Sequence, residues 1–184
     1  KAREYLQWRE HYEKIINEYI KGFSEGEKPK VYMEWGHEAG RSYGRGSSGQ
    51  TMCTFAGGRN IASELSEFPT VSMEWVVEQN PDVIVKSINL NGRWGWDNRE
   101  EPERIIAELK SRPGWNVISA VKNNRVYIFS SEISWGLDSI VGTAYWVEWF
   151  HPALDINPQN IYREYLERFL EVEYPQDLIF AYPP

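Results

Sequence analysis

The chain has 184 residues, of which 41% are hydrophobic and 26% charged, and its formal net charge at pH 7 is −7. This composition predicts one globular domain, or one domain with an added element, and the acidic charge argues against nucleic acid or an anionic membrane surface as the main partner. No apolar run approaches the length that spans a membrane. Aromatic residues make up 15% of the chain, and several fall in glycine-rich segments, where they are candidates for binding as well as for packing.

The first segment has the pattern of an amphipathic helix. Apolar side chains recur at spacings of three and four residues over positions 5–23. No Ser, Thr, Asp or Asn precedes this pattern to cap the helix. We therefore expect a helix that is already under way at residue 2, and a longer protein from which an N-terminal part is missing.

A short strand is predicted at residues 30–36, after a polar linker that contains Gly and Pro. It opens into a loop with five glycines at 36–50, and an apolar stretch that follows predicts a short helix ending at Gly57-Gly58. Glycines in such a loop allow the backbone to approach a ligand closely.

Residues 70–87 give the clearest pattern of the chain. Ser72 is a predicted N-cap, and Asn80-Pro81 is a predicted helix end. The apolar run at 82–85 then predicts a strand buried on both faces. A loop with two tryptophans, two arginines and two glycines follows at 88–99.

The second half of the chain repeats this alternation. A helix is predicted from Pro102 to Arg112, and a strand at 125–129. A third loop at 130–139 leads into an apolar helix that stops at His151-Pro152. The last predicted helix is amphipathic and starts at Asn157.

Strands that alternate with helices predict an α/β fold, a three-layer αβα Rossmann-like lobe with a mostly parallel sheet and a long helix before it. Its parallel strands are expected near 30–35, 82–86 and 125–129. The three long loops all leave carboxyl ends of strands, and open α/β sheets bind ligands at that edge. We therefore expect the loops to converge on one site, with an unusual amount of exposed aromatic surface.

Four stretches resemble, in the same order, segments of the periplasmic binding proteins of ABC importers for iron-siderophore, haem and cobalamin. They are FAGGRNIASEL (55–65), TVSMEWVVEQNPDVIV (70–85), WNVISAVKNNRVYIF (115–129) and WFHPAL (149–154). Together with the flanking elements the resemblance covers residues 30 to about 170.

In that family two lobes are joined by one long helix, and the ligand lies between them. The resemblance implies that residues 1–24 are the interlobe helix and residues 25–184 the C-terminal lobe, with the N-terminal lobe absent. It implies an extracytoplasmic protein, tethered to the membrane in its full-length form, that delivers an iron(III) chelate to an ABC permease. It implies no catalysis and no resident cofactor. Glu74, two residues after Ser72, matches the family's glutamate that docks on permease arginines, although a glutamate also suits the first turn of a helix.

Arginine and aromatic side chains in the three loops are the predicted ligand contacts. Guanidinium groups bind anionic chelates, and indole rings pack on flat chelate or macrocycle surfaces. The predicted ligand-binding residues are Arg41, Tyr43 and Arg45 in the first loop, Arg93, Trp94 and Trp96 in the second, and Trp135 in the third.

Direct metal coordination and catalysis find little support in the sequence. His37 and Glu38 are adjacent, so their side chains rarely reach one ion, and no further metal-ligand framework accompanies them. Cys53 lies in an apolar helix without a basic neighbour and is expected to be a buried thiol. No nucleophile motif or carboxylate pair is recognisable.

Two other classes of protein remain open on the sequence alone. A carbohydrate-binding module would use the Trp and Tyr loops as a sugar platform, but such modules are usually β-sandwiches, so the fold discriminates. A chelatase-like intracellular enzyme would share the lobe architecture.

Overall fold

Three strands with hydrophobic side chains on both faces form the centre of the structure. The computed structural model describes residues 1–183. Strands β1 (Lys30–Trp35), β3 (Val83–Ile88) and β4 (Val126–Ser130) run parallel, and every residue of β3 is buried. These are the strands expected from the apolar runs in the sequence, within one or two residues.

Two short strands complete the sheet. β2 (Arg59–Asn60) pairs parallel with β1, and β5 (Ala181–Tyr182) pairs antiparallel with β4. The order across the sheet is β2-β1-β3-β4-β5. The sequence predicted neither edge strand, because two residues are too few to show an alternating pattern.

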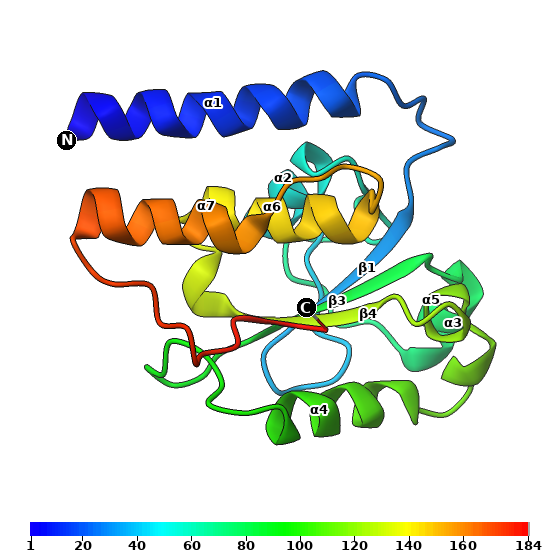
Figure 1. The fold of residues 1–184 in the computed structure, drawn as a ribbon. Coiled ribbons are helices and arrows are strands. Elements are labelled where there is room, and N and C mark those ends of the chain that lie inside the picture. Colours follow the sequence, from blue (N-terminus) through cyan, green and yellow to red (C-terminus); the bar gives the residue numbers. More distant parts are fainter. Residues whose placement is uncertain (184) are drawn as a thin grey trace.

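Helices cover both faces of this sheet (Figure 1). One face carries α2 (Ser48–Phe55), α6 (Ser139–Phe150) and α7 (Pro158–Tyr165), which continues as a π-helical segment, η3 (Leu166–Leu170). The other carries α3 (Met73–Gln79), α4 (Glu100–Lys110) and α5 (Ser119–Lys122). Two 3-10 turns complete the structure: η1 (Trp115–Val117) precedes α5, and η2 (Ser131–Ile133) follows β4. The predicted three-layer αβα fold is confirmed.

The helix ends follow the predicted signals. The Ser72 side chain accepts a hydrogen bond from the backbone N–H of Trp75 at 3.1 Å, which caps α3. Asn80 ends that helix in the left-handed conformation. The Asn157 side chain caps α7 through the N–H of Asn160 at 2.9 Å. The first helix has no side-chain cap, as its sequence indicated.

The first helix, α1 (Ala2–Ile20), lies outside the three layers and runs over α6 and α7 (Figure 1). Trp8 and Ile16 are its buried residues, and the Trp8 indole N–H donates to the carboxylate of Glu164 on α7 at 2.8 Å. The division at residue 24 between this helix and the lobe stays a prediction.

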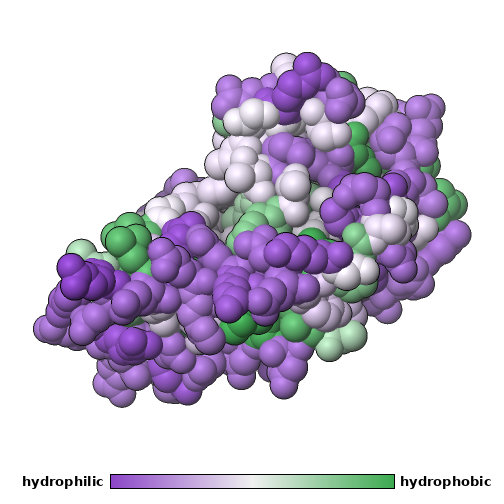
Figure 2. All heavy atoms as spheres, turned by 90° about the horizontal axis from the view of Figure 1, so that it is seen from above, coloured by the Kyte–Doolittle hydropathy of each residue, from purple (hydrophilic) through white to green (hydrophobic). Residues whose placement is uncertain are grey.

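Hydrophobic side chains are gathered inside the structure. Ten residues of α6 are buried, because this helix lies between α1 and the sheet. Seen from the side of α1, the surface is mostly hydrophilic, with hydrophobic residues in small separate patches (Figure 2). Among residues 1–183, no helix is both long enough and apolar enough to cross a membrane.

Candidate ligand-binding site

A cleft opens where the carboxyl ends of the three central strands meet. The loops after β1, β3 and β4 converge there, as their position in a parallel sheet requires. The cleft has a volume of about 470 Å³. It is lined by Trp35, Gly36, His37, Glu38, Arg41, Tyr43, Ser87, Asn89, Asn91, Ser131 and Trp135.

An arginine and three aromatic rings form a continuous row in this cleft. The guanidinium carbon of Arg41 lies 3.8 Å from the ring centroid of Trp35. The centroids of Trp35 and Tyr43 are 6.3 Å apart, and those of Tyr43 and Trp135 are 5.8 Å apart. We call these four residues the aromatic row. It combines ring surfaces with one cation, which is paired with Glu38 of the same cleft at 3.4 Å.

The first loop is fixed in place by hydrogen bonds to the strand that precedes it. The N–H of Gly40 donates to a carboxylate oxygen of Glu34 at 3.0 Å, and the Ser42 hydroxyl donates to the carbonyl of Met33 at 2.6 Å. Gly40 has a φ of +83°, and a Cβ there would lie 2.3 Å from the carbonyl oxygen of Val71. Only glycine fits this position, so the loop holds Arg41 and Tyr43 in a defined conformation.

Beneath the loops lies a buried ionic cluster of Glu34, Lys86, Arg112 and Tyr32. The Glu34 side chain has an exposed fraction of 0%. Arg112 donates to both carboxylate oxygens, at 2.7 and 2.8 Å, and Lys86 donates to one of them. The Tyr32 hydroxyl donates at 3.0 Å. One carboxylate therefore faces two cations, which leaves a net positive charge beneath the loops.

The surroundings of Glu34 keep it ionised. Burial alone would raise the pKa of this carboxyl, but the hydrogen bonds from Arg112 and the charge of Lys86 outweigh it and lower the pKa to about 2. Sequence reasoning missed this cluster. The available signal was a charged residue within each of two apolar strands, and these charges pair because Glu34 and Lys86 are in register.

A second, smaller hollow adjoins the cleft and contains Arg93. His37, Asn89 and Asn91 line both spaces, and the second has a volume of about 180 Å³. Arg93 is paired there with Glu101 at 3.1 Å, and Lys86 forms part of the wall. This predicted residue thus lies beside the cleft, on its α4 side.

Three of the predicted ligand contacts, Arg41, Tyr43 and Trp135, do come together in the cleft. Arg45 does not line it. Its guanidinium pairs with Glu64 at 2.8 Å, and both side chains are largely exposed. Trp94 is 38% exposed on the second loop but is also outside the cleft lining.

Trp96 corrects the expectation that the second loop displays both of its indoles. Its exposed fraction is 1%, and the ring belongs to the core on the α4 side of the sheet. Its backbone pairs with Ile179 through two hydrogen bonds of 2.9 Å, which fasten the loop to the C-terminal segment. Because its ring is buried, Trp96 contributes to the hydrophobic core and does not line the cleft.

The remaining candidates concern metal, thiol and docking chemistry. No group of three or more His, Cys, Asp or Glu side chains within residues 1–183 is placed to hold a metal ion. Cys53 is fully buried, and burial raises the pKa of its thiol, so the thiolate that reacts is disfavoured. Glu74 is exposed in the first turn of α3.

The sequence pattern of the periplasmic binding protein family matches residues 1–133. The chain belongs to this family. The family is one of binding proteins, in agreement with the prediction that the chain is not an enzyme, and it sets aside the chelatase-like alternative. The α/β fold sets aside the carbohydrate-binding module, for which a β-sandwich was expected.

Solved periplasmic binding proteins share the fold of this chain. The TroA-like protein FepB of Veillonella parvula superposes with a TM-score of 0.86 at 22% identity, covering 98% of this chain and 55% of its own. MolA of Haemophilus influenzae, bound to molybdate, superposes with a TM-score of 0.73 at 21% identity, covering 94% of this chain and 51% of its own. CeuE of Helicobacter pylori, in a nickel-histidine complex, superposes with a TM-score of 0.69 at 21% identity, covering 91% of this chain and 51% of its own.

This periplasmic binding protein chain spans about half the length of those structures. Comparison with curated protein sequences finds no significant match.

Proposed function

We propose that this chain is the C-terminal lobe of an extracytoplasmic solute-binding protein that serves an ABC importer of iron(III) chelates. The chelate, of the siderophore, haem or cobalamin type, is held between this lobe and an N-terminal lobe of the same protein and is then passed to the membrane permease. In this proposal α1 is the interlobe helix, and a membrane anchor tethers the full-length protein.

The aromatic row is the observation that carries the proposal. A ferric chelate whose ligands are catecholates or carboxylates has net negative charge and apolar surfaces. Arg41, which is paired with Glu38 at 3.4 Å, provides a cation at one end of the row, and Tyr43 and Trp135 provide rings at the other. The net charge of the Glu34 cluster adds a positive field beneath the same loops.

Two of the similar structures support a solute that contains a metal. MolA is bound to molybdate, and CeuE is in a nickel-histidine complex. The cleft of this chain has no metal-ligand cluster among its described residues, which favours a metal that arrives already chelated. Of the predicted contacts, we propose Arg41, Tyr43 and Trp135 as first ligand contacts and Arg93 as a flanking charge, while Arg45, Trp94 and Trp96 lie outside the cleft lining.

The test is ligand binding by the full-length, two-lobe protein, followed through its intrinsic fluorescence. The probes are ferric tris-catecholate, which has net negative charge, hemin, cyanocobalamin, molybdate and nickel-histidine. We expect at least one of the two iron complexes, ferric tris-catecholate and hemin, to bind, and both Arg41→Ala and Trp135→Ala to weaken its binding at least tenfold. Arg45→Ala is the matched control, because it removes an arginine of the same loop that lies outside the cleft. The affinity of this variant for the ligand should stay within twofold of the wild-type value.

Binding of molybdate, nickel-histidine or cyanocobalamin (a cobalt complex) without either iron complex would overturn the iron(III) chelate while leaving the cleft as the site. An affinity that Arg45→Ala lowers as much as Arg41→Ala would place the ligand elsewhere. Tight binding by the isolated lobe, equal to that of the two-lobe protein, would show that the ligand does not lie between lobes.

A further inference from the structure

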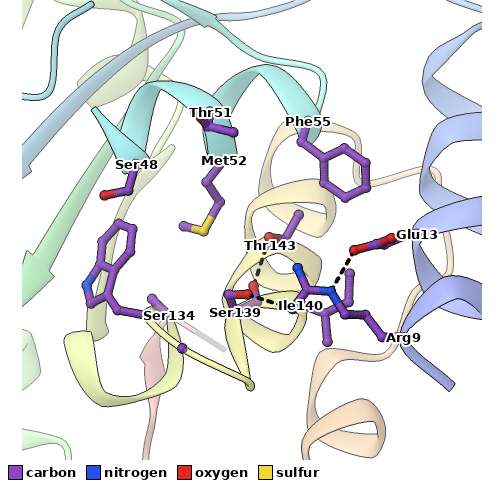
Figure 3. Close-up of a pocket in the computed structure, with 12 residues that line it drawn as sticks. Arg9, Glu13, Ser48, Thr51, Met52, Phe55, Ser134, Ser139, Ile140 and Thr143 are labelled. Atoms are coloured by element: carbon purple, nitrogen blue, oxygen red, sulfur yellow. Dashed lines mark hydrogen bonds and ion pairs between the residues drawn. The ribbon is translucent and has the colours of Figure 1, made fainter. Parts of the chain in front are cut away.

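A large groove lies next to the cleft, between α1, α2 and the start of α6. Its volume is about 690 Å³, within the range of small-molecule sites, which is about 300–1,000 Å³. Ser48, Thr51, Met52 and Phe55 follow one another along α2 on one wall, and Ser139, Ile140 and Thr143 come from α6 opposite (Figure 3). Arg9 and Glu13 of α1 close the far end (Figure 3).

The groove is apolar inside and electrically neutral at its α1 end. Met52, Phe55 and Ile140 provide hydrophobic surface. Arg9 is already paired with Glu13 at 2.7 Å and donates to the Ser139 hydroxyl at 3.1 Å (Figure 3). The charges at this end are therefore already paired, and an uncharged, apolar group of a ligand fits it.

One polar group in the groove wall has no partner. The Ser134 hydroxyl oxygen is buried and forms no hydrogen bond within residues 1–183. Buried polar atoms are nearly always satisfied, so an unpartnered hydroxyl in a residue of the groove wall is an unusual feature of this region. Apolar walls with a small number of polar groups are the usual make-up of a small-molecule compartment.

Trp135 connects the groove to the cleft. Its side chain lines both spaces, and it is the last ring of the aromatic row. The ring of Tyr43, 5.8 Å from it, lines the cleft only. The groove thus adjoins the cleft across one indole, and a ligand seated at Arg41 could reach it past Trp135.

We propose that the groove holds an apolar arm, an alkyl or aryl group, of the ligand whose charged head occupies the cleft. The substrate class is then an amphiphilic chelate. This inference rests on the proposed function for the nature of the head. The proposed occupant of the groove is the ligand, and the alternative occupant is a side chain of the N-terminal lobe.

The test uses two anionic ferric chelates that differ only in their tails, ferric tris(4-methylcatecholate) and ferric tris(4-octylcatecholate), together with iron-free 4-octylcatechol. The full-length protein should bind the octyl chelate at least tenfold more tightly than the methyl chelate, because methylene groups leave water for an apolar wall. Thr51→Trp, which fills the groove from an exposed position on α2, should abolish that difference and leave the affinity for the methyl chelate unchanged. Thr54→Trp places the same ring on the same helix outside the groove and should change neither affinity.

Each other outcome decides a different point. Equal binding of both ferric chelates, unchanged by Thr51→Trp, overturns the groove and leaves the proposed function standing. A preference for the octyl chelate in the isolated lobe that disappears in the full-length protein shows that the N-terminal lobe fills the groove, which also overturns the inference. Tight binding of iron-free 4-octylcatechol that Thr51→Trp abolishes, with no gain from iron, supports the groove and overturns the ferric head.

Discussion

Glu34 and Lys86 lie directly opposite each other on the neighbouring parallel strands β1 and β3, and their charges meet in the interior. Arg112 joins them from the segment after α4, and Gly40 joins them from the first loop of the cleft. One buried carboxylate thus ties two strands, the end of α4 and a ligand-binding loop together. The ionic cluster is both a part of the core and the support of the site.

Replacing Glu34 by Gln should destabilise the lobe strongly. The change leaves Lys86 and Arg112 buried without a counter-charge, and breaking a buried pair in this way costs about 3 to 5 kcal/mol. Urea unfolding followed by circular dichroism measures the loss. Glu64→Gln, which removes the exposed partner of Arg45, is the control and should leave the unfolding midpoint unchanged. Equal midpoints for both variants would contradict this account of the cluster.

The same carboxylate should make stability depend on acid pH. The pKa of Glu34 in the fold is about 2, below its ordinary value of 4.5. A lowered pKa stabilises the fold above pH 4.5, and this stabilisation, about 3 kcal/mol, is lost as the pH falls from 4.5 towards 2. The difference in unfolding free energy between wild type and Glu34→Gln should therefore shrink between pH 6 and pH 3. A constant difference would mean that the pKa is not lowered.

The two tryptophans of the second loop should respond oppositely to removal. Trp96→Ala takes a fully packed ring out of the core and should cost about 3 to 5 kcal/mol of stability. Trp94→Ala removes a ring that is 38% exposed, and a much smaller loss is expected. Thermal unfolding of the two variants side by side checks this. If Trp94 proved the costlier loss, the placement of the loop would be wrong.

Glu74 should matter for transport and little for folding. Its carboxylate is exposed at the start of α3, so Glu74→Ala removes at most a helix-dipole contribution of about 1 kcal/mol. If Glu74 docks on a permease arginine, Glu74→Arg in the full-length protein should impair uptake and leave ligand affinity intact. Binding and uptake are measured in parallel for both variants, with Glu78→Arg, on the same short helix, as the control. Normal uptake by Glu74→Arg would remove the docking role from this residue.

The elements with strong local patterns could be predicted from the sequence. The buried strand at 82–85 and the caps Ser72 and Asn157 depend on neighbouring residues, and the structure has them as expected. The convergence of the three loops followed from the parallel sheet, which fixes where strand ends lie. The proximity of Arg41, Tyr43 and Trp135, which line one cleft, therefore follows from the sequence pattern.

The features that were missed depend on contacts between distant segments. Trp94 and Trp96 are two residues apart in one loop, and only the pairing of Trp96 with Ile179 decides which ring is buried. The Glu34 cluster needs the register of β1 with β3 and the position of Arg112, neither of which the sequence pattern specifies. The groove beside α1 likewise depends on how helices pack together.

Trp135 forms a wall of both the cleft and the groove, and this shared wall has a thermodynamic consequence. In the proposed binding mode, the head and the tail of one amphiphilic ligand contact the same indole. If the head and the tail influence each other through this ring, the influence is reciprocal: the factor by which the tail strengthens binding of the head equals the factor by which the head strengthens binding of the tail. Such coupling would change the affinity for the short-tailed chelate when Thr51→Trp fills the groove, so the unchanged affinity expected there corresponds to head and tail contributions that add.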